Sequence, residues 1–99
     1  DKVFSREIEA IANSEDILIA ITTSGKSSNI LKALEAAKSK KVYTVVLTGS
    51  GRGKLPDYAI SLNIPSEDTA RIQECHILIG HIICELVEFD MFKDLAPLK

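Results

Sequence analysis

The sequence has almost no excess of charge of either sign. Lysine and arginine number 12, aspartate and glutamate 14, and the formal net charge at pH 7 is −2. A broad nucleic-acid surface normally needs a basic excess, so this balance argues against a nucleic-acid partner. No apolar run is long enough to cross a bilayer, and no stretch has the pattern of a signal peptide. We therefore expect a cytoplasmic protein that has no membrane partner.

Cysteine is scarce and tryptophan is absent. Cys75 and Cys84 fall nine residues apart in one helical pattern, so roughly 13 Å of helix rise separates them. That distance excludes a disulfide between the two and fits a reducing compartment. A chain of 99 residues forms one domain at most. It begins at Asp1 and its first residues already predict helix, so we expect a piece of a longer protein.

Apolar runs and amphipathic segments alternate along the chain. Three apolar runs are typical of strands, the first two of strands buried on both faces, and they lie at 17–21, 42–47 and about 58–63. Helical periodicity is found in three segments, at 3–12, 28–39 and 66–92. This alternation predicts an α/β protein, with helices on both faces of a parallel sheet.

The most informative segment joins the first predicted strand to the helix that follows it. Residues 22–28 read TTSGKSS, with five hydroxyl side chains in seven residues. We call this segment the hydroxyl loop. The first backbone N–H groups of a helix have no intrahelical partner, and the helix dipole favours an anion there. Hydroxyl groups add further donors, and Ser27 or Ser28 can cap the helix. The segment therefore predicts a phosphate site, and we favour a sugar phosphate as its ligand.

Two other interpretations of this loop stay open. Ala20, together with Gly25-Lys26-Ser27, fits a relaxed nucleotide P-loop. However, Ala20 belongs to the predicted strand, and no second strand ends in an aspartate suited to Mg²⁺. A capped turn without a ligand is the other alternative, but it needs fewer hydroxyls. The glycine-rich residues 48–53 follow the second strand and form either a wall of the ligand site or a plain turn.

The last helical segment is apolar around nearly its whole circumference, which is typical of a buried helix. A domain of this size has difficulty burying such a helix alone, so we expect a subunit interface. Gln73, His76, His81 and Glu85 lie among its apolar residues, and polar groups at such depth must be paired or functional. Gln73 and His81 are eight residues apart, about 80° of rotation and roughly 12 Å of rise. From this spacing alone, a satisfied core histidine is the simpler interpretation.

Read together, three segments and His81 resemble one family. The segments are residues 22–29 (TTSGKSSN), 47–49 (LTG) and 65–76 (PSEDTARIQECH). They are similar to the sugar isomerase (SIS) domain and, within it, to the phosphoheptose isomerases. The resemblance covers nearly the whole chain. The hydroxyl loop identifies only the superfamily. The Arg-Ile-Gln-Glu run at the start of the last helix narrows the resemblance to a smaller group within that superfamily.

The resemblance implies a fold and a domain assignment. The fold is a three-layer α/β/α sandwich of the Rossmann-like or flavodoxin-like kind. Residues 1–99 would be the C-terminal portion of a single SIS domain, apparently truncated at its N-terminus.

The resemblance also implies an activity. Phosphoheptose isomerases convert sedoheptulose 7-phosphate to D-glycero-D-manno-heptose 7-phosphate, a step toward bacterial lipopolysaccharide and other surface sugars. They are cytoplasmic homotetramers, often with zinc. The family's phosphate loop corresponds to four residues here, Thr22, Thr23, Ser24 and Ser27. Its glutamine metal ligand corresponds to Gln73, which we expect to contact both the metal and the substrate. Its histidine ligand, also an acid/base, corresponds to His81.

Some positions depart from the family pattern. Thr22 stands where serine is frequent, Lys26 where asparagine is frequent, and Ala70 where some members have aspartate. Family members are also about twice as long, and the half with a catalytic glutamate and a further histidine ligand is absent here. We therefore expect this chain alone to hold half an active site and to be inactive.

Two non-catalytic alternatives come from the same resemblance. One SIS relative associates with the bacterial replication initiator and shares the hydroxyl loop, but it lacks the histidine that matches His81. A sugar-phosphate-sensing regulatory domain is the other. His81 favours the enzyme, because a ketose–aldose isomerase needs a proton carrier that works near neutral pH.

Overall fold

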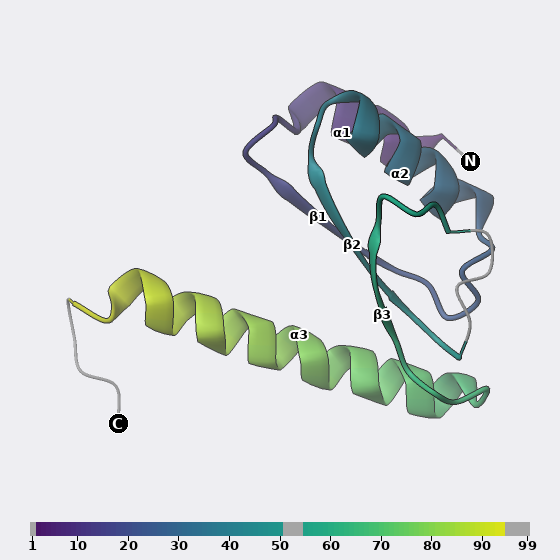
Figure 1. The fold of residues 1–99 in the computed structure, drawn as a ribbon, viewed down its shortest axis with the longest axis vertical. Helices are drawn as coiled ribbons and strands as arrows, with labels where there is room; N and C mark the ends of the chain where they lie inside the picture. The colour runs from purple at the N-terminus through teal and green to yellow at the C-terminus, as the bar shows by residue number, and fades with distance from the viewer. Residues whose placement is uncertain (1, 51–54, 95–99) are drawn as a thin grey trace.

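The chain alternates helices and strands as its pattern predicts (Figure 1). The structure is a computed structural model that describes residues 2–50 and 55–94. Its elements, in order, are α1 (Val3–Ile11), β1 (Ile17–Ile21), α2 (Ser28–Ser39), β2 (Tyr43–Thr48), β3 (Ile60–Asn63) and α3 (Thr69–Phe92).

The three strands form one parallel sheet in the order β1-β2-β3. Ile21 lies opposite Leu47 in the first pair, and Thr48 lies opposite Asn63 in the second. Because all three strands run in the same direction, their carboxyl ends meet at one edge of the sheet. The predicted parallel α/β architecture is confirmed.

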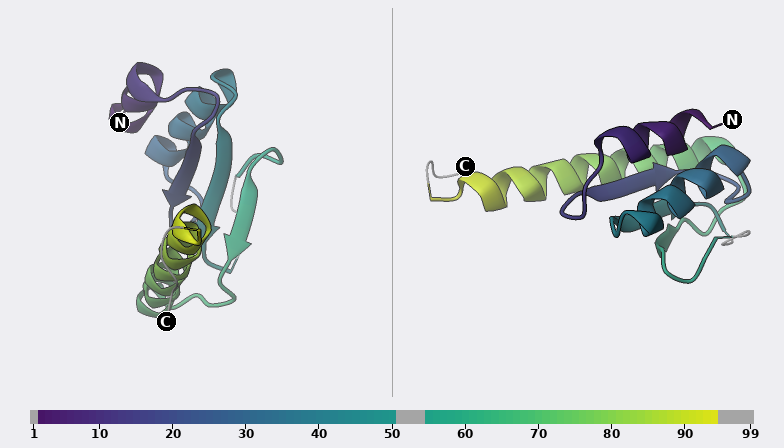
Figure 2. Two further views of the ribbon diagram at one scale, coloured as in Figure 1. Left: turned by 90° about the vertical axis from the view of Figure 1, so that its left-hand side faces the viewer. Right: turned by 90° about the horizontal axis from the view of Figure 1, so that it is seen from above.

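α1 and α2 cover one face of the sheet (Figure 2). The core between α2 and the strands includes Leu34 and Val46, both fully buried. A second cluster joins α1 to α2 through Ile8 and Ala33. Lys40, just after α2, donates hydrogen bonds from Nζ to the carbonyl oxygens of Ile8 at 3.3 Å and Glu9 at 2.8 Å. These bonds tie the end of α2 to the end of α1.

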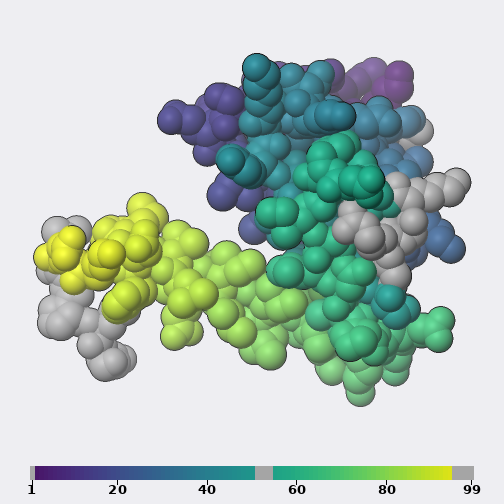
Figure 3. Space-filling view, in the orientation of Figure 1, coloured from purple at the N-terminus to yellow at the C-terminus, as the bar shows by residue number. Residues whose placement is uncertain are grey.

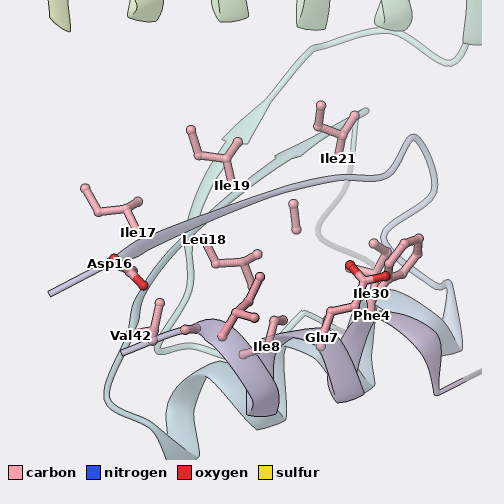
Figure 4. A pocket seen from close by; sticks show the side chains of 14 residues that line it. Phe4, Glu7, Ile8, Asp16, Ile17, Leu18, Ile19, Ile21, Ile30 and Val42 are labelled. Carbon is pink, nitrogen blue, oxygen red and sulfur yellow. The ribbon is translucent and has the colours of Figure 1, made fainter. Parts of the chain in front are cut away.

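β1 is buried on one face only in this chain. Leu18 and Ala20 pack toward the helices, whereas Ile17, Ile19 and Ile21 are exposed. Figure 4 shows these three isoleucines pointing to the side of the sheet opposite α1. An apolar groove of about 620 Å³ lies between α1 and β1. The prediction that this strand is buried on both faces is therefore wrong for the chain as it stands.

α3 lies on the other side of the sheet from α1 and α2 and projects beyond it as an arm (Figure 3). Only Ile72 and His76 of its 24 residues are buried. Gln73 and His81 are exposed, so the prediction that they lie at depth is wrong in this chain. Its exposed large apolar side chains are Ile77, Leu78, Ile82, Leu86, Val87, Phe89, Met91 and Phe92. The expected subunit interface over them stays a prediction. In the described parts of the chain, no helix has both the length and the apolar character needed to span a membrane.

The observed boundaries differ from the predicted ones at two elements in particular. β3 begins at Ile60 rather than near residue 58, because the chain is still turning there. α3 begins at Thr69 rather than Ser66, because Asp68 caps it by accepting a hydrogen bond from the Ala70 amide at 3.0 Å. Ser66 Oγ in turn accepts from the Asp68 amide at 3.0 Å, which holds the preceding turn.

Candidate functional site

The hydroxyl loop after β1 is fastened to the end of β2 by two backbone hydrogen bonds. The Thr22 amide donates to the Leu47 carbonyl at 2.9 Å, and the Gly49 amide donates to the Thr23 carbonyl at 3.2 Å. The pairing of the two strands thus continues past their ends. It places the loop and the residues after β2 side by side at the carboxyl edge of the sheet.

The loop is shaped by its own hydroxyl groups. Thr22 is buried, and its Oγ1 accepts from the Gly25 amide at 3.2 Å. Ser24 Oγ accepts from the Lys26 amide at 3.0 Å. Gly25 has φ 71°, a left-handed conformation that glycine adopts without steric cost. Each hydroxyl used as an acceptor still has its own O–H group to donate.

The start of α2 has no side-chain cap. Ser27 occupies the capping position, but its side chain makes no capping hydrogen bond, so the prediction of a serine cap is wrong. Its carbonyl accepts from the Leu31 amide at 3.0 Å, as the first intrahelical bond. An uncapped helix start offers its first amides to an anion. Ala20 and Ile21 lie within β1, which leaves too short a loop for a nucleotide P-loop.

A surface pocket of about 490 Å³ brings three parts of the chain together. The hydroxyl loop forms one wall, Ser50 after β2 forms the second, and the start of α3 forms the third. The lining residues are Thr23, Ser24, Lys26, Ser50, Ser66, Glu67, Thr69 and Ile72. The sequence did not indicate that Ser66 and Thr69 would meet the hydroxyl loop in one pocket.

The pocket is polar and carries both signs of charge. Lys26 supplies a cation within the hydroxyl loop, and Glu67 supplies a carboxylate just before α3. A phosphate would be favoured by Lys26 and the hydroxyl donors and disfavoured near Glu67. The polyol part of a sugar phosphate would instead give hydroxyls for Glu67 to accept. Of the glycine-rich segment 48–53, residues 51–53 lie outside the described residues.

Gln73 and His81 do not line this pocket. Both are exposed on α3, which is continuous helix between them, so they stay two turns apart. Within residues 2–50 and 55–94, no three His, Cys, Asp or Glu side chains come together as a metal site. The two predicted ligands are therefore separated, and the described residues contain no complete metal site. Cys75 and Cys84 are both free thiols.

His76 is the residue whose role the sequence did not reveal. It is 3 % exposed, and its Nε2 lies 2.9 Å from the Thr48 carbonyl oxygen. Its Nδ1 is buried without a hydrogen-bond partner among the described residues. Spacing could not distinguish it from the other polar residues, because a helix that is apolar all round does not indicate which face meets the sheet.

Comparison with known proteins agrees with this geometry. The SIS domain family matches residues 1–49. The phosphoheptose isomerase of Sulfurimonas denitrificans is 48 % identical over 95 residues, which are 95 % of this chain and 49 % of the relative. That of Helicobacter pylori is 49 % identical over 89 residues, which are 89 % of this chain and 46 % of the relative.

Solved structures give the same result. Phosphoheptose isomerase GmhA from Neisseria gonorrhoeae superposes with a TM-score of 0.80 at 40 % identity, over 86 % of this chain and 49 % of that one. A phosphoheptose isomerase from Francisella tularensis gives 0.82 at 40 % identity, over 87 % and 47 %. The chain spans about half the length of the curated relatives it matches. From its parallel sheet, its hydroxyl loop and these similarities, the chain belongs to the SIS domain family.

Proposed function

We propose that this chain is part of a phosphosugar isomerase that converts sedoheptulose 7-phosphate to D-glycero-D-manno-heptose 7-phosphate. The observation that carries the proposal is the pocket in which the hydroxyl loop meets the start of α3. Relatives named phosphoheptose isomerase, at 48 and 49 % identity, support the substrate class. Such a protein would act in the cytoplasm, in the synthesis of lipopolysaccharide and related surface sugars.

The phosphate end of the substrate is assigned to the hydroxyl loop. Thr23 and Ser24 line the pocket and can donate O–H groups to phosphate oxygens. Ser27 stands at the uncapped start of α2, where a phosphate would also meet the first helical amides. Thr22, buried with its oxygen bonded to the Gly25 amide, acts by holding the loop in shape. A phosphate anchored here supplies binding energy and aligns the distant reacting carbons.

The chemical step is assigned to α3. A ketose–aldose isomerase moves a proton between C1 and C2 through an enediol-like intermediate, and it needs an acid, a base and charge stabilisation. We assign proton transfer to His81 and a neutral oxygen contact with the substrate to Gln73. The same two residues are our proposed ligands for zinc. Gln73 and His81 are exposed and lie two turns apart. A zinc ion bound by both would therefore need further ligands beyond the described residues.

A homotetramer is part of this proposal. The tetramer is supported by the row of exposed apolar side chains along α3. Exposure of these side chains to water is unfavourable, and a second copy that covers them would remove this cost. A subunit interface along α3 would also bring groups of a neighbouring copy close to Gln73 and His81.

The test is a direct assay of the natural full-length protein that contains this chain. It is incubated with sedoheptulose 7-phosphate, and the aldose product is followed by NMR. We expect turnover, and we expect inorganic phosphate to inhibit it by occupying the hydroxyl loop. A folded protein that makes no aldose would refute the isomerase. Tight ATP binding without turnover would instead support the nucleotide interpretation of the loop.

A further inference from the structure

Two buried side chains hold α3 to the rest of the described chain. They are Ile72 and His76, four residues apart and therefore on one face of the helix. Ile72 meets Gly49 so closely that a Cβ on Gly49 would come within 2.8 Å of Ile72 Cδ1. His76 Nε2 lies 2.9 Å from the carbonyl oxygen of Thr48. One apolar and one polar contact thus fix the start of α3 to two consecutive residues at the end of β2.

The polar contact determines which ring nitrogen of His76 carries hydrogen. The Thr48 carbonyl oxygen has no hydrogen of its own, so it accepts from Nε2–H. It also accepts from the Ile64 amide at 3.0 Å, which links the same atom to the segment after β3. Thr48 is fully buried and His76 nearly so. A hydrogen bond shielded from water in this way is costly to lose, because its donor is left unpaired.

We propose that His76 is a positioning residue of the candidate site. Its bond to Thr48 sets the distance between the start of α3 and the hydroxyl loop. That distance determines the width of the pocket, since Ser66 and Thr69 line it on the α3 side. Only the sugar-phosphate identity of the ligand rests on the proposed function; the geometric role of His76 does not.

His76 and His81 have separate roles in this arrangement. They are five residues apart, about 140° around the helix axis, and His81 is exposed where His76 is buried. Gln73 lies one turn before His76, so the same hydrogen bond also fixes how Gln73 is presented. His76 acts on the ligand only through the backbone that it holds.

The test compares two variants of the natural full-length protein. His76→Phe keeps a ring of similar size but has no donor, and His76→Gln keeps an N–H donor. For folded His76→Phe we expect affinity for inorganic phosphate to fall about tenfold and kcat/KM for sedoheptulose 7-phosphate to fall about 10- to 100-fold, since small misplacements are costly. We expect His76→Gln to recover most of both losses. A purely structural role would lower the melting temperature but leave the affinity of the folded variants unchanged.

If His76→Phe does not fold, the position of the ring hydrogen of His76 in the parent gives a second test. In the ¹⁵N-labelled parent we expect the His76 ring to carry hydrogen on Nε2, with and without phosphate. A neutral ring with its hydrogen on Nδ1 would overturn the proposal, and so would parent affinity and kinetics in folded His76→Phe. A parent that binds phosphate but does not isomerise the sugar would refute only the proposed function. A folded parent that does not bind phosphate would refute both.

Discussion

Gly49 donates its amide hydrogen to the Thr23 carbonyl oxygen at 3.2 Å, and a Cβ on Gly49 would lie 2.7 Å from that same oxygen. The backbone after β2 therefore approaches the hydroxyl loop as closely as a residue without a side chain allows. Ile72 Cδ1 of α3 also lies close, 2.8 Å from the same Cβ position. Glycine at this point lets three segments meet around one pocket.

Gly49→Ala is expected to destabilise the protein by about 1–3 kcal/mol, since the new methyl group overlaps a backbone oxygen that cannot rotate away. Urea unfolding of the natural full-length protein measures the change. Gly80→Ala is the matched control. A Cβ on Gly80 meets nothing within 4 Å, and alanine is the better helix former by about 1 kcal/mol. Equal stability of Gly49→Ala and the parent would contradict the close approach.

Lys41→Gly is expected to stabilise the protein by about 0.5–1 kcal/mol. Lys41 follows α2 with φ 60°, a left-handed conformation that is strained for a residue with a Cβ. The helix ends there in a Schellman motif, with the Lys41 amide donating to Lys38 and the Val42 amide donating to Ala37. Lys41→Ala keeps the Cβ and serves as the control, with no comparable gain in urea unfolding. A loss of stability with glycine would contradict this explanation.

Ser24→Ala is expected to weaken phosphate binding about 10- to 100-fold, which corresponds to loss of one hydrogen bond to a charged group, roughly 1.5–3 kcal/mol. The variant also loses the acceptor for the Lys26 amide, so the loop becomes less well defined. Calorimetric titration with inorganic phosphate measures the affinity. Ser39→Ala, at the far end of α2 and exposed, is the control and should bind as the parent does. Unchanged affinity in Ser24→Ala would remove the loop from the phosphate site.

His81→Asn is expected to leave the protein folded but to lower kcat for sedoheptulose 7-phosphate by about 10²-fold or more, as loss of a general acid or base does. Because His81 is exposed, its replacement should cost little stability in the chain itself. Glu88→Gln, another exposed change on α3, should turn over at the parent rate. If His81→Asn matched the parent, catalysis by this side chain would be excluded and the partner-binding alternative would gain support.

The natural full-length protein is expected to sediment as a tetramer at micromolar concentration. Leu78→Glu and Ile82→Glu would each place a charge in the apolar row of α3 and should shift the protein toward smaller species. Lys93→Glu, which removes the exposed ion pair between Lys93 and Asp90, is a control at the edge of this row. A parent that sediments as a monomer would contradict the interface.

Local patterns made β1 and α2 predictable to the residue. The apolar run of β1 ends where the hydroxyls begin, and α2 begins after the serine at its capping position. The start of α3 was predicted less accurately, since Ser66 and Asp68 both suit a cap. Asp68 is the cap, because its carboxylate accepts a hydrogen bond from the Ala70 amide. Residue spacing alone does not reveal this hydrogen bond.

The pocket was only partly predictable for a similar reason. The hydroxyl loop is contiguous and therefore visible in the sequence, but Ser50 and Thr69 reach it from distant segments. The anchoring role of His76 depends on which face of α3 meets Thr48. That face is set by the contacts of Ile72 with Gly49 and of His76 with Thr48, not by periodicity.

Because the strands are parallel, the residues that line the pocket and the residues that form the core lie in different parts of the fold. The pocket is made from loops at one rim of the sheet, whereas the packed interior around Leu34 and Val46 lies behind that rim. Substitutions in the rim loops can therefore alter which ligand the pocket accepts while leaving the free energy of folding nearly unchanged. Thr48 and Gly49 are the exception. Gly49 approaches Thr23 and Ile72, which line the pocket, and the Thr48 carbonyl holds His76 of α3. A substitution at either position is therefore expected to change both ligand binding and the stability of the fold.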